Sequence, residues 1–255
     1  MAELPRITLI VTEDRIHQLE CTRCDKTTAG SLPDGVSGGC FGLFLQAALA
    51  TLAGAYRLSK RRIQQIAHVR FGLKVSIGMI AKLERQTASV LEAPYAKLPA
   101  SVQHANVVNL DETSWRENRN KAWLWTAWLW TAWLWTVWLW TAWLWTAWLA
   151  TAVTHVATVL FIAARRTREV AESILGDTAG RIVGSVASRG DLAQNEWGTN
   201  SETGSRLVER MRSVVATCIH QKRDALEYLS SCLLANRRGP LSPSLLPATT
   251  ERIVA

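Results

Sequence analysis

Val107-Val108-Asn109-Leu110-Asp111 is a short apolar run that ends in an acidic residue. Apolar and β-branched residues in such a run favour a buried strand, so the sequence predicts a strand with Asp111 at its carboxyl end. A carboxylate at that position can bind Mg²⁺ for phosphoryl transfer. A single carboxylate is also typical of a solvated loop, so a catalytic role for Asp111 needs carboxylate partners from other strands.

The stretch that follows, residues 122–151, contains six successive copies of Ala-Trp-Leu-Trp-Thr, with Val137 and Ala150 as the two departures. A period of five matches neither regular structure, because Trp spreads over all faces of a helix and the two faces of a strand swap at every copy. When five copies are removed, the remaining sequence is that of an ordinary β-hairpin. This favours a tandem duplication of a short codon block.

Two other interpretations of the repeat stay open. Residues 122–164 carry no formal charge and are longer than the roughly 20 residues that a transmembrane helix needs, although Trp prefers the membrane interface to its interior. The repeated Trp could also form a stacking platform for nucleic-acid bases.

Helical periodicity dominates the chain before the strand. A first helix begins near Phe41 and ends near Gly54–Arg57, and Ser59 and Ser76 are suitable N-caps for two more. The next two helices are expected over Lys60–Arg70 and from Ile77 to about Ala93, with Phe71-Gly72-Leu73 as the turn between them. A loop with Pro94 and Pro99 then leads to the strand.

This helix pair is compatible with a helix-turn-helix, in which the second helix enters the major groove while basic residues contact phosphate. Two packed surface helices with a solvated basic face explain the pattern equally well. The candidate DNA-binding residues are Lys60, Arg61, Arg62, Lys82 and Arg85.

The remaining elements are short. A strand or hairpin is expected within residues 6–20, followed by a tight turn at Cys21–Asp25, and residues 186–200 suggest no regular structure. Beyond the repeat, the expected elements are a strand over Val153–Ala164, a helix over Thr167–Leu175, a strand over Arg181–Ser185, helices over Gly204–Ile219 and Arg223–Asn236, and a loop from Gly239.

The chain has 255 residues, a net charge of +8 and 48% apolar residues, enough for a sizeable core. The basic surplus favours a polyanionic partner, either nucleic acid or an acidic membrane surface. Five cysteines, an odd number with one close pair, argue against a secreted disulfide framework. Without a visible signal peptide, we expect a cytoplasmic protein.

Cys21-x-x-Cys24 could supply half of a tetrahedral zinc site. A second pair at suitable spacing is missing, and His17 and Cys40 are possible further ligands that nothing fixes in place. Free buried cysteines are therefore favoured over zinc binding.

Taken together, these segments resemble the transposases of the insertion sequence 66 family, over nearly the whole chain. Each motif is common, but their order along the chain is specific. The matching segments are Cys21-x-x-Cys24, Tyr56–Arg61, Phe71-Gly72, Asp111–Trp115, Ala122–Trp125, Ala152–Thr154, Ile182–Ser185, Gly198–Ser201, Gly204–Arg206, Val208–Arg210, Thr217-Cys218 and Pro243–Pro247.

The resemblance implies an N-terminal zinc-binding region, a helix-turn-helix and a catalytic domain similar to ribonuclease H. In this family an Asp-Asp-Glu trio holds two Mg²⁺ ions that activate the attacking oxygen and stabilise the leaving one. The implied partners are DNA at the transposon ends and further copies of the chain in a homo-oligomer, while a membrane is not an expected partner.

The chain departs from the family at two of the three catalytic positions. Asp111 matches the first Asp, whereas Val186 stands where the second should follow Ile182–Ser185, and Asp191 nearby is a poor substitute. The helix with the third residue, a Glu, is absent, and the neighbours of Glu196 do not match it. The first cysteine pair of the zinc region is also missing. We therefore interpret the chain as a truncated, internally deleted copy that has lost catalysis.

The expected fold class is α+β or α/β, with an N-terminal helical DNA-binding region, an incomplete ribonuclease H-like domain and C-terminal helices. The expected domains are a partial zinc-binding-like region at 1–40, a helix-turn-helix region at 41–100, the incomplete catalytic domain at 106–200 and a helical region at 201–255. Two alternatives to a transposase are a small membrane-associated protein that spans through residues 122–164, and a misfolded remnant without function.

Overall fold

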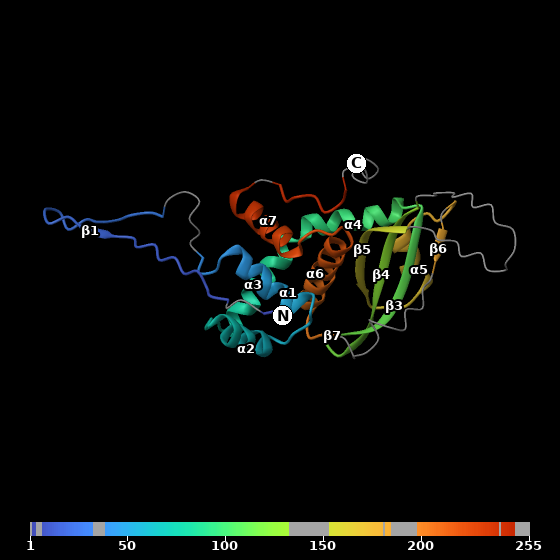
Figure 1. The fold of residues 1–255 in the computed structure, drawn as a ribbon, viewed down its shortest axis with the longest axis horizontal. Helices are drawn as coiled ribbons and strands as arrows, with labels where there is room; N and C mark the ends of the chain where they lie inside the picture. The colour runs from blue at the N-terminus through green and yellow to red at the C-terminus, as the bar shows by residue number, and fades with distance from the viewer. Residues whose placement is uncertain are drawn as a thin grey trace.

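The computed structural model of the chain describes residues 2–3, 7–32, 39–132, 153–180, 182–184, 198–239 and 241–247. Figure 1 shows a body in which helices lie on one side of a twisted sheet. In chain order the elements are β1 (Gln18–Glu20), β2 (Thr27–Ala29), α1 (Leu43–Gly54), α2 (Lys60–Phe71), α3 (Ile77–Val90), α4 (Glu92–His104), β3 (Val107–Glu117), β4 (Asn120–Ala132), β5 (Val153–Ala163), α5 (Arg168–Leu175), β6 (Ile182–Gly184), β7 (Gly198–Thr199), α6 (Glu202–His220) and α7 (Ala225–Arg238). This mixed content agrees with the expected α+β class. The bounds of the four expected domains stay predictions.

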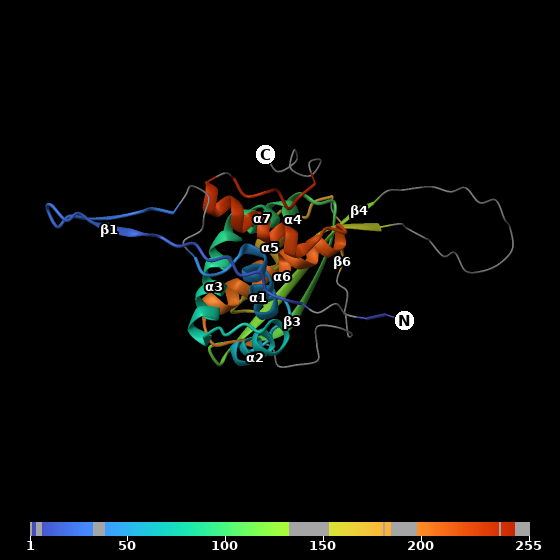
Figure 2. The ribbon, with the colours of Figure 1, turned by 60° about the vertical axis from the view of Figure 1, so that its left-hand side comes forward.

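α2 and α3 begin at their predicted N-caps, and α3 ends at Val90, earlier than the predicted Ala93. The Ser59 side chain accepts a hydrogen bond from the backbone N–H of Arg62, and that of Ser76 from the N–H of Met79. Gly72 ends α2 with a φ of 65°, a left-handed conformation that costs glycine little because it has no Cβ. The hairpin β1–β2 is shorter than the strand expected within residues 6–20, and it stands away from the body in both Figures 1 and 2.

The expected loop around Pro94 and Pro99 is wrong, because α4 runs through both residues. Pro94 is the third residue of the helix, where its missing N–H would have no acceptor within the helix. Pro99 lies further inside and removes one hydrogen bond. Burial compensates for that loss, since Leu98 and Val102 are both fully buried in the core.

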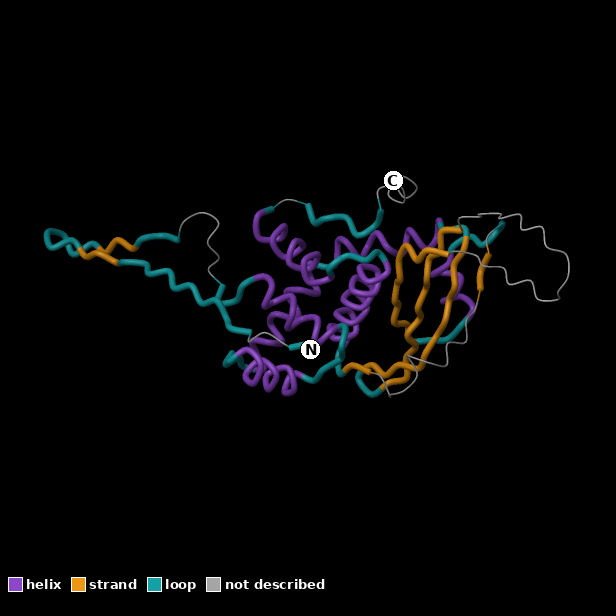
Figure 3. Tube along the Cα trace, viewed as in Figure 1, coloured by secondary structure: helices purple, strands orange, loops and turns teal. Residues whose placement is uncertain are grey.

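The large sheet has the strand order β5-β4-β3-β6, and β7 also pairs with β3 (Figure 3). β3 and β4 are antiparallel, as are β4 and β5, whereas β6 and β7 run parallel to β3. Helix α5 lies in the connection from β5 to β6. Side chains of α4 and α5 share one core with Val108, Leu110 and Trp125 of the sheet, so these two helices cover that face.

β3 is longer than the sequence predicts, and this corrects the position of Asp111. The expected strand ends at Asp111, but β3 continues to Glu117. The whole length of β3 pairs with β4, with Asp111 opposite Thr126. Cross-strand pairing therefore extends the strand through a polar stretch that has weak strand propensity of its own.

The first two copies of the Trp repeat, residues 122–131, lie in β4. Ala122 of the first copy packs in one core cluster and Ala127 of the second copy in the other, which is the change of face expected from a period of five. The prediction of a helix that spans a membrane through 122–164 has no support, because residues 122–132 and 153–163 are strands. Within the described ranges, no helix is long and apolar enough for such a span. The rest of the repeat, residues 133–151, lies outside the described residues.

Helix α6 closes the outer edge of β5 with polar side chains. The backbone N–H of Thr158 donates to Thr217 Oγ1 at 3.1 Å, that of Leu160 to Ser213 Oγ at 2.9 Å, and that of Ile162 to a Glu209 carboxylate oxygen. The acceptors are four residues apart on the helix and the donors two apart on the strand. These spacings correspond to about 6 Å along the helix and about 6.6 Å along the strand, so each acceptor on α6 can lie opposite an N–H donor on β5.

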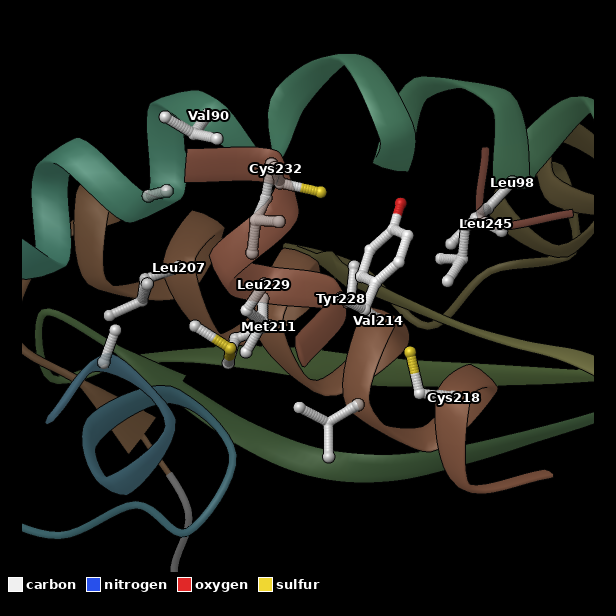
Figure 4. Close-up of a cluster of buried hydrophobic side chains, with 14 of the residues drawn as sticks. Val90, Leu98, Leu207, Met211, Val214, Cys218, Tyr228, Leu229, Cys232 and Leu245 are labelled. Carbon is white, nitrogen blue, oxygen red and sulfur yellow. The ribbon is translucent and has the colours of Figure 1, made fainter. Parts of the chain in front are cut away.

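α7 and the chain after it complete the core. Figure 4 shows Met211 of α6 beside Leu229 of α7, and both side chains are fully buried. The segment 241–247, expected as a loop, has no regular structure but is anchored. Leu245 is buried and its carbonyl accepts a hydrogen bond from Gln221, while the Tyr228 hydroxyl donates to the Pro243 carbonyl at 2.9 Å.

Candidate nucleic-acid interface

Helices α2 and α3 present basic side chains on adjoining exposed surfaces. Arg61 and Arg62 are exposed in the first turn of α2, and Lys82 and Arg85 are exposed on α3. The opposite side of α3 is buried through residues such as Ile80 and Leu83. The structure therefore presents four of the five predicted DNA-binding residues to solvent.

The location of the arginines on α2 is not explained by helix stability. The first turn of α2 contains no acidic residue, and it begins Lys60-Arg61-Arg62. The helix dipole favours acidic residues at this end, so cations there are unfavourable by about 0.3–1 kcal/mol each. Unpaired N–H groups at a helix N-terminus also attract anions. Both effects make this end of α2 a surface for an external anion.

Lys60 has a different environment from the other four residues. Its ammonium lies 2.7 Å from the carboxylate of Glu84, which is buried on α3. This ion pair neutralises a buried acid and joins α2 to α3, so Lys60 serves the packing of the two helices. Glu84 was not among the predicted site residues, although an acidic residue on the helix that follows the basic segment Lys60–Arg62 was an available signal.

Asp111 is held by backbone pairing in the middle of the sheet. β6 pairs with β3 up to Asn109, two residues before Asp111, and the last residue of β6 in this register is Gly184. Val186, Asp191 and Glu196 lie outside the described residues. In the described part of the chain, no group of three His, Cys, Asp or Glu side chains could hold a metal ion. The Mg²⁺ site that the resemblance implies therefore stays a prediction.

Cys21 and Cys24 lie in the tight turn that the sequence predicts. The backbone N–H groups of Cys24 and Asp25 both donate to the Cys21 carbonyl, at 3.3 and 2.8 Å. Hydrogen bonds from the backbone of Arg23 and from Cys24 lower the pKa of the Cys21 thiol below its ordinary value. No third His, Cys, Asp or Glu joins the pair among the described residues.

The expectation that Cys21 and Cys24 are buried is wrong, because both are exposed. Cys218 and Cys232 are buried between α6 and α7, whereas Cys21, Cys24 and Cys40 are exposed. Burial raises the pKa of Cys218 and of Cys232 to about 11. The buried thiols have a place in packing, and the exposed ones are available to solvent.

Three motifs that are far apart in the sequence meet at one junction. The guanidinium of Arg57, in the loop between α1 and α2, lies 4.7 Å from the ring centre of Trp115 on β3. Arg57 also donates a hydrogen bond to the carbonyl of Gly198 on β7. Burial, and secondarily the charge of Arg212, lowers the pKa of Arg57 to about 10. This junction attaches the helices to the sheet.

The junction also explains the glycine at position 198. A Cβ on Gly198 would lie 2.5 Å from the carbonyl oxygen of Arg116, which is too close for any side chain. The neighbouring Thr199 accepts a hydrogen bond at its carbonyl from the N–H of Asn118, at 2.8 Å. These residues are therefore explained by packing and backbone pairing, without a chemical role.

Comparison with known proteins adds one match. Residues 38–133 match a family model described as transposase, IS66 family. The matched segment covers α1 to α4, β3 and β4, and so includes the basic helices and Asp111. No curated protein and no solved structure matches the chain.

Proposed function

We propose that the chain, which matches the IS66 transposase family model over residues 38–133, is a transposase that binds DNA through α2 and α3 and does not catalyse strand transfer. The observation that carries this proposal is the exposed basic surface of Arg61, Arg62, Lys82 and Arg85, which lies within the matched segment.

The helix pair supports DNA binding in the manner of a helix-turn-helix. α3 packs on its inner side through Ile80 and Leu83, and its outer side is accessible to a groove. The first turn of α2 contains basic residues that helix stability does not explain. Basic residues at this position are expected if the helix contacts phosphate. The Lys60–Glu84 ion pair keeps the two helices in a fixed relation, which a shape-specific DNA contact needs.

A ribonuclease H-like domain is supported by the position of Asp111. The residue lies on the central strand of the large sheet, and β6, the strand that leads toward position 186, runs parallel to β3 on the side away from β4. Position 186 holds Val in place of the second Asp. Two-metal catalysis needs several carboxylates around both ions, so one matched carboxylate leaves the metals unheld.

The DNA-binding part is tested by fluorescence anisotropy on a random 20-base-pair duplex. We expect binding that weakens with salt, because Lys and Arg release counterions from DNA. The double variant R61A/R62A should weaken binding about tenfold and reduce the salt slope by about 2, roughly one for each lost phosphate contact. The matched control is R165A/R168A, two exposed arginines close to and within α5. Equal loss in both double variants, or binding that is insensitive to salt, contradicts the proposal.

The catalytic part is tested by a strand-transfer assay with Mg²⁺ and the DNA ends of the element. We expect no joined product from the wild-type chain. Joined product that disappears in D111N would show that the chain is an active transposase. Zinc binding at Cys21 and Cys24, a cytoplasmic location and assembly with further copies stay predictions.

A further inference from the structure

A pocket of about 450 Å³ lies between α3, α7 and the loop that leads into α1. Its walls include Lys82, Gln86 and Ser89 of α3, Asn236 and Arg237 of α7, and Phe41. The volume is within the range of small-molecule sites, about 300–1,000 Å³. The sequence alone does not indicate this pocket, because α3 and α7 are about 150 residues apart and only the fold brings them together.

The pocket is positively charged. Two cations, Lys82 and Arg237, are among its lining residues, and no carboxylate is among the lining residues that the structure describes. A concave surface with one sign of charge concentrates ligands of the other sign. The pocket is therefore complementary to an anion.

Arg237 is held in place before any ligand arrives. Its Nη2 donates to the Phe41 carbonyl at 3.2 Å and to Gln46 Oε1 at 3.4 Å. Gln46 in turn donates to Thr87 Oγ1 at 3.4 Å, and the side chains of Gln46 and Thr87 are buried. A guanidinium fixed in this way keeps other N–H groups for a phosphate and loses little entropy when it binds one.

The rest of the lining suits a nucleobase. Gln86 and Asn236 carry amides that both donate and accept hydrogen bonds, and Phe41 offers an aromatic face. A base in a duplex cannot enter such a pocket, because its edges and faces are covered by pairing and stacking. Enzymes that bind a base in a pocket take it from single-stranded DNA or out of the stack.

We propose that this pocket binds an unpaired nucleotide of the DNA that lies on α2 and α3. Its phosphate lies at Lys82 and Arg237, and its base lies against Phe41 and the amides of Gln86 and Asn236. The inference rests on the proposed DNA binding and names the DNA feature that the surface selects. Lys82 connects the two, because it lines the pocket and is also one of the exposed basic residues of α3.

The test compares two DNA probes on the full chain by fluorescence anisotropy at one salt concentration. One is a blunt 20-base-pair duplex, and the other is the same duplex with a three-nucleotide single-stranded overhang. We expect the overhang to bind about tenfold more tightly, because only the overhang offers an unpaired base that can stack on an aromatic side chain. Equal affinity for the two probes overturns the pocket assignment and leaves DNA binding intact. No binding to either probe overturns the proposed function as well.

Variants locate the preference in the pocket. Q86A/N236A, which changes two exposed side chains, should bind the blunt duplex as the wild type does and lose the preference for the overhang. The control Q18A, an exposed amide on β1, should keep it. Loss of affinity for both probes in the double variant would mean general backbone contact and would overturn the assignment.

A third arm distinguishes DNA from a free nucleotide as the source of the ligand. Deoxyadenosine monophosphate at 1 mM, about a thousandfold above the probe, should displace little of the overhang probe, and full displacement would assign the pocket to free nucleotides. Cys40 lines the pocket and its thiol is exposed, so alkylation mapped by mass spectrometry gives a direct readout. The overhang probe, and not the blunt duplex, should slow modification of Cys40, and equal rates would place the nucleotide elsewhere.

Discussion

Replacing Ser213 by Ala removes the middle contact between α6 and the edge of β5. Ser213 is fully buried, and its hydroxyl accepts a hydrogen bond from the N–H of Leu160 at 2.9 Å. The variant leaves that N–H without its acceptor, and an unsatisfied buried donor costs about 1–3 kcal/mol. Ala is a better helix former than Ser by at most about 0.5 kcal/mol. We therefore expect the free energy of unfolding to fall by about 1–2 kcal/mol.

Equilibrium unfolding in urea measures this loss. With a denaturant slope of about 2–3 kcal/mol/M, the midpoint of S213A should be about 0.5 M below that of the wild type, with an unchanged slope. The matched control is S231A on α7, where the exposed hydroxyl donates to the Glu227 carbonyl at 2.9 Å within its own helix. The control should change stability by less than about 0.5 kcal/mol. If both variants shift the midpoint equally, α6 does not satisfy the strand edge and the reasoning fails.

Three further predictions concern packing and the buried thiols. G54A should destabilise the protein by about 1–3 kcal/mol in the same urea assay, because a Cβ at position 54 would lie 2.7 Å from the side chain of Met211. Unchanged stability would mean that α1 and α6 can separate without cost. At pH 8 a colorimetric thiol reagent should modify Cys218 and Cys232 only after unfolding, since a pKa of about 11 leaves about one thiol in a thousand ionised. Folding raises these two pKa values above their ordinary 9.0. The stability that the neutral thiols contribute is therefore complete below pH 9 and is lost as the pH rises through about 11. A urea midpoint that stays constant between pH 9 and 11 contradicts the assignment.

The elements that could be predicted from sequence are those with local signals. Ser59 and Ser76 fix the starts of α2 and α3 through their own side chains, and Gly72 fixes an end through its own backbone freedom. Helix α4 could not be predicted in this way. Its two prolines favour a loop locally, and only the burial of Leu98 against distant residues reverses that preference.

The same distinction between local signals and distant packing applies to the candidate site. The exposure of Arg61 and Arg62 follows from the helical pattern of α2, and this part of the interface was predictable. The pairing of Lys60 with Glu84, and the pocket that Lys82 shares with Arg237, depend on how α3 packs against α2 and α7. Spacing along a sequence carries no information about such contacts until the packing is known.

The junction of Arg57, Trp115 and Gly198 stabilises the fold, and none of the three is a catalytic residue that the resemblance implies. All three residues belong to motifs that make the family resemblance specific, yet each is accounted for by a cation–π contact, a hydrogen bond or a close approach of backbone. A change confined to the catalytic carboxylates that the resemblance implies would leave these three contacts in place. A chain without strand transfer can accordingly keep the arrangement that presents α2 and α3 to DNA, and so DNA binding and catalysis can be lost independently.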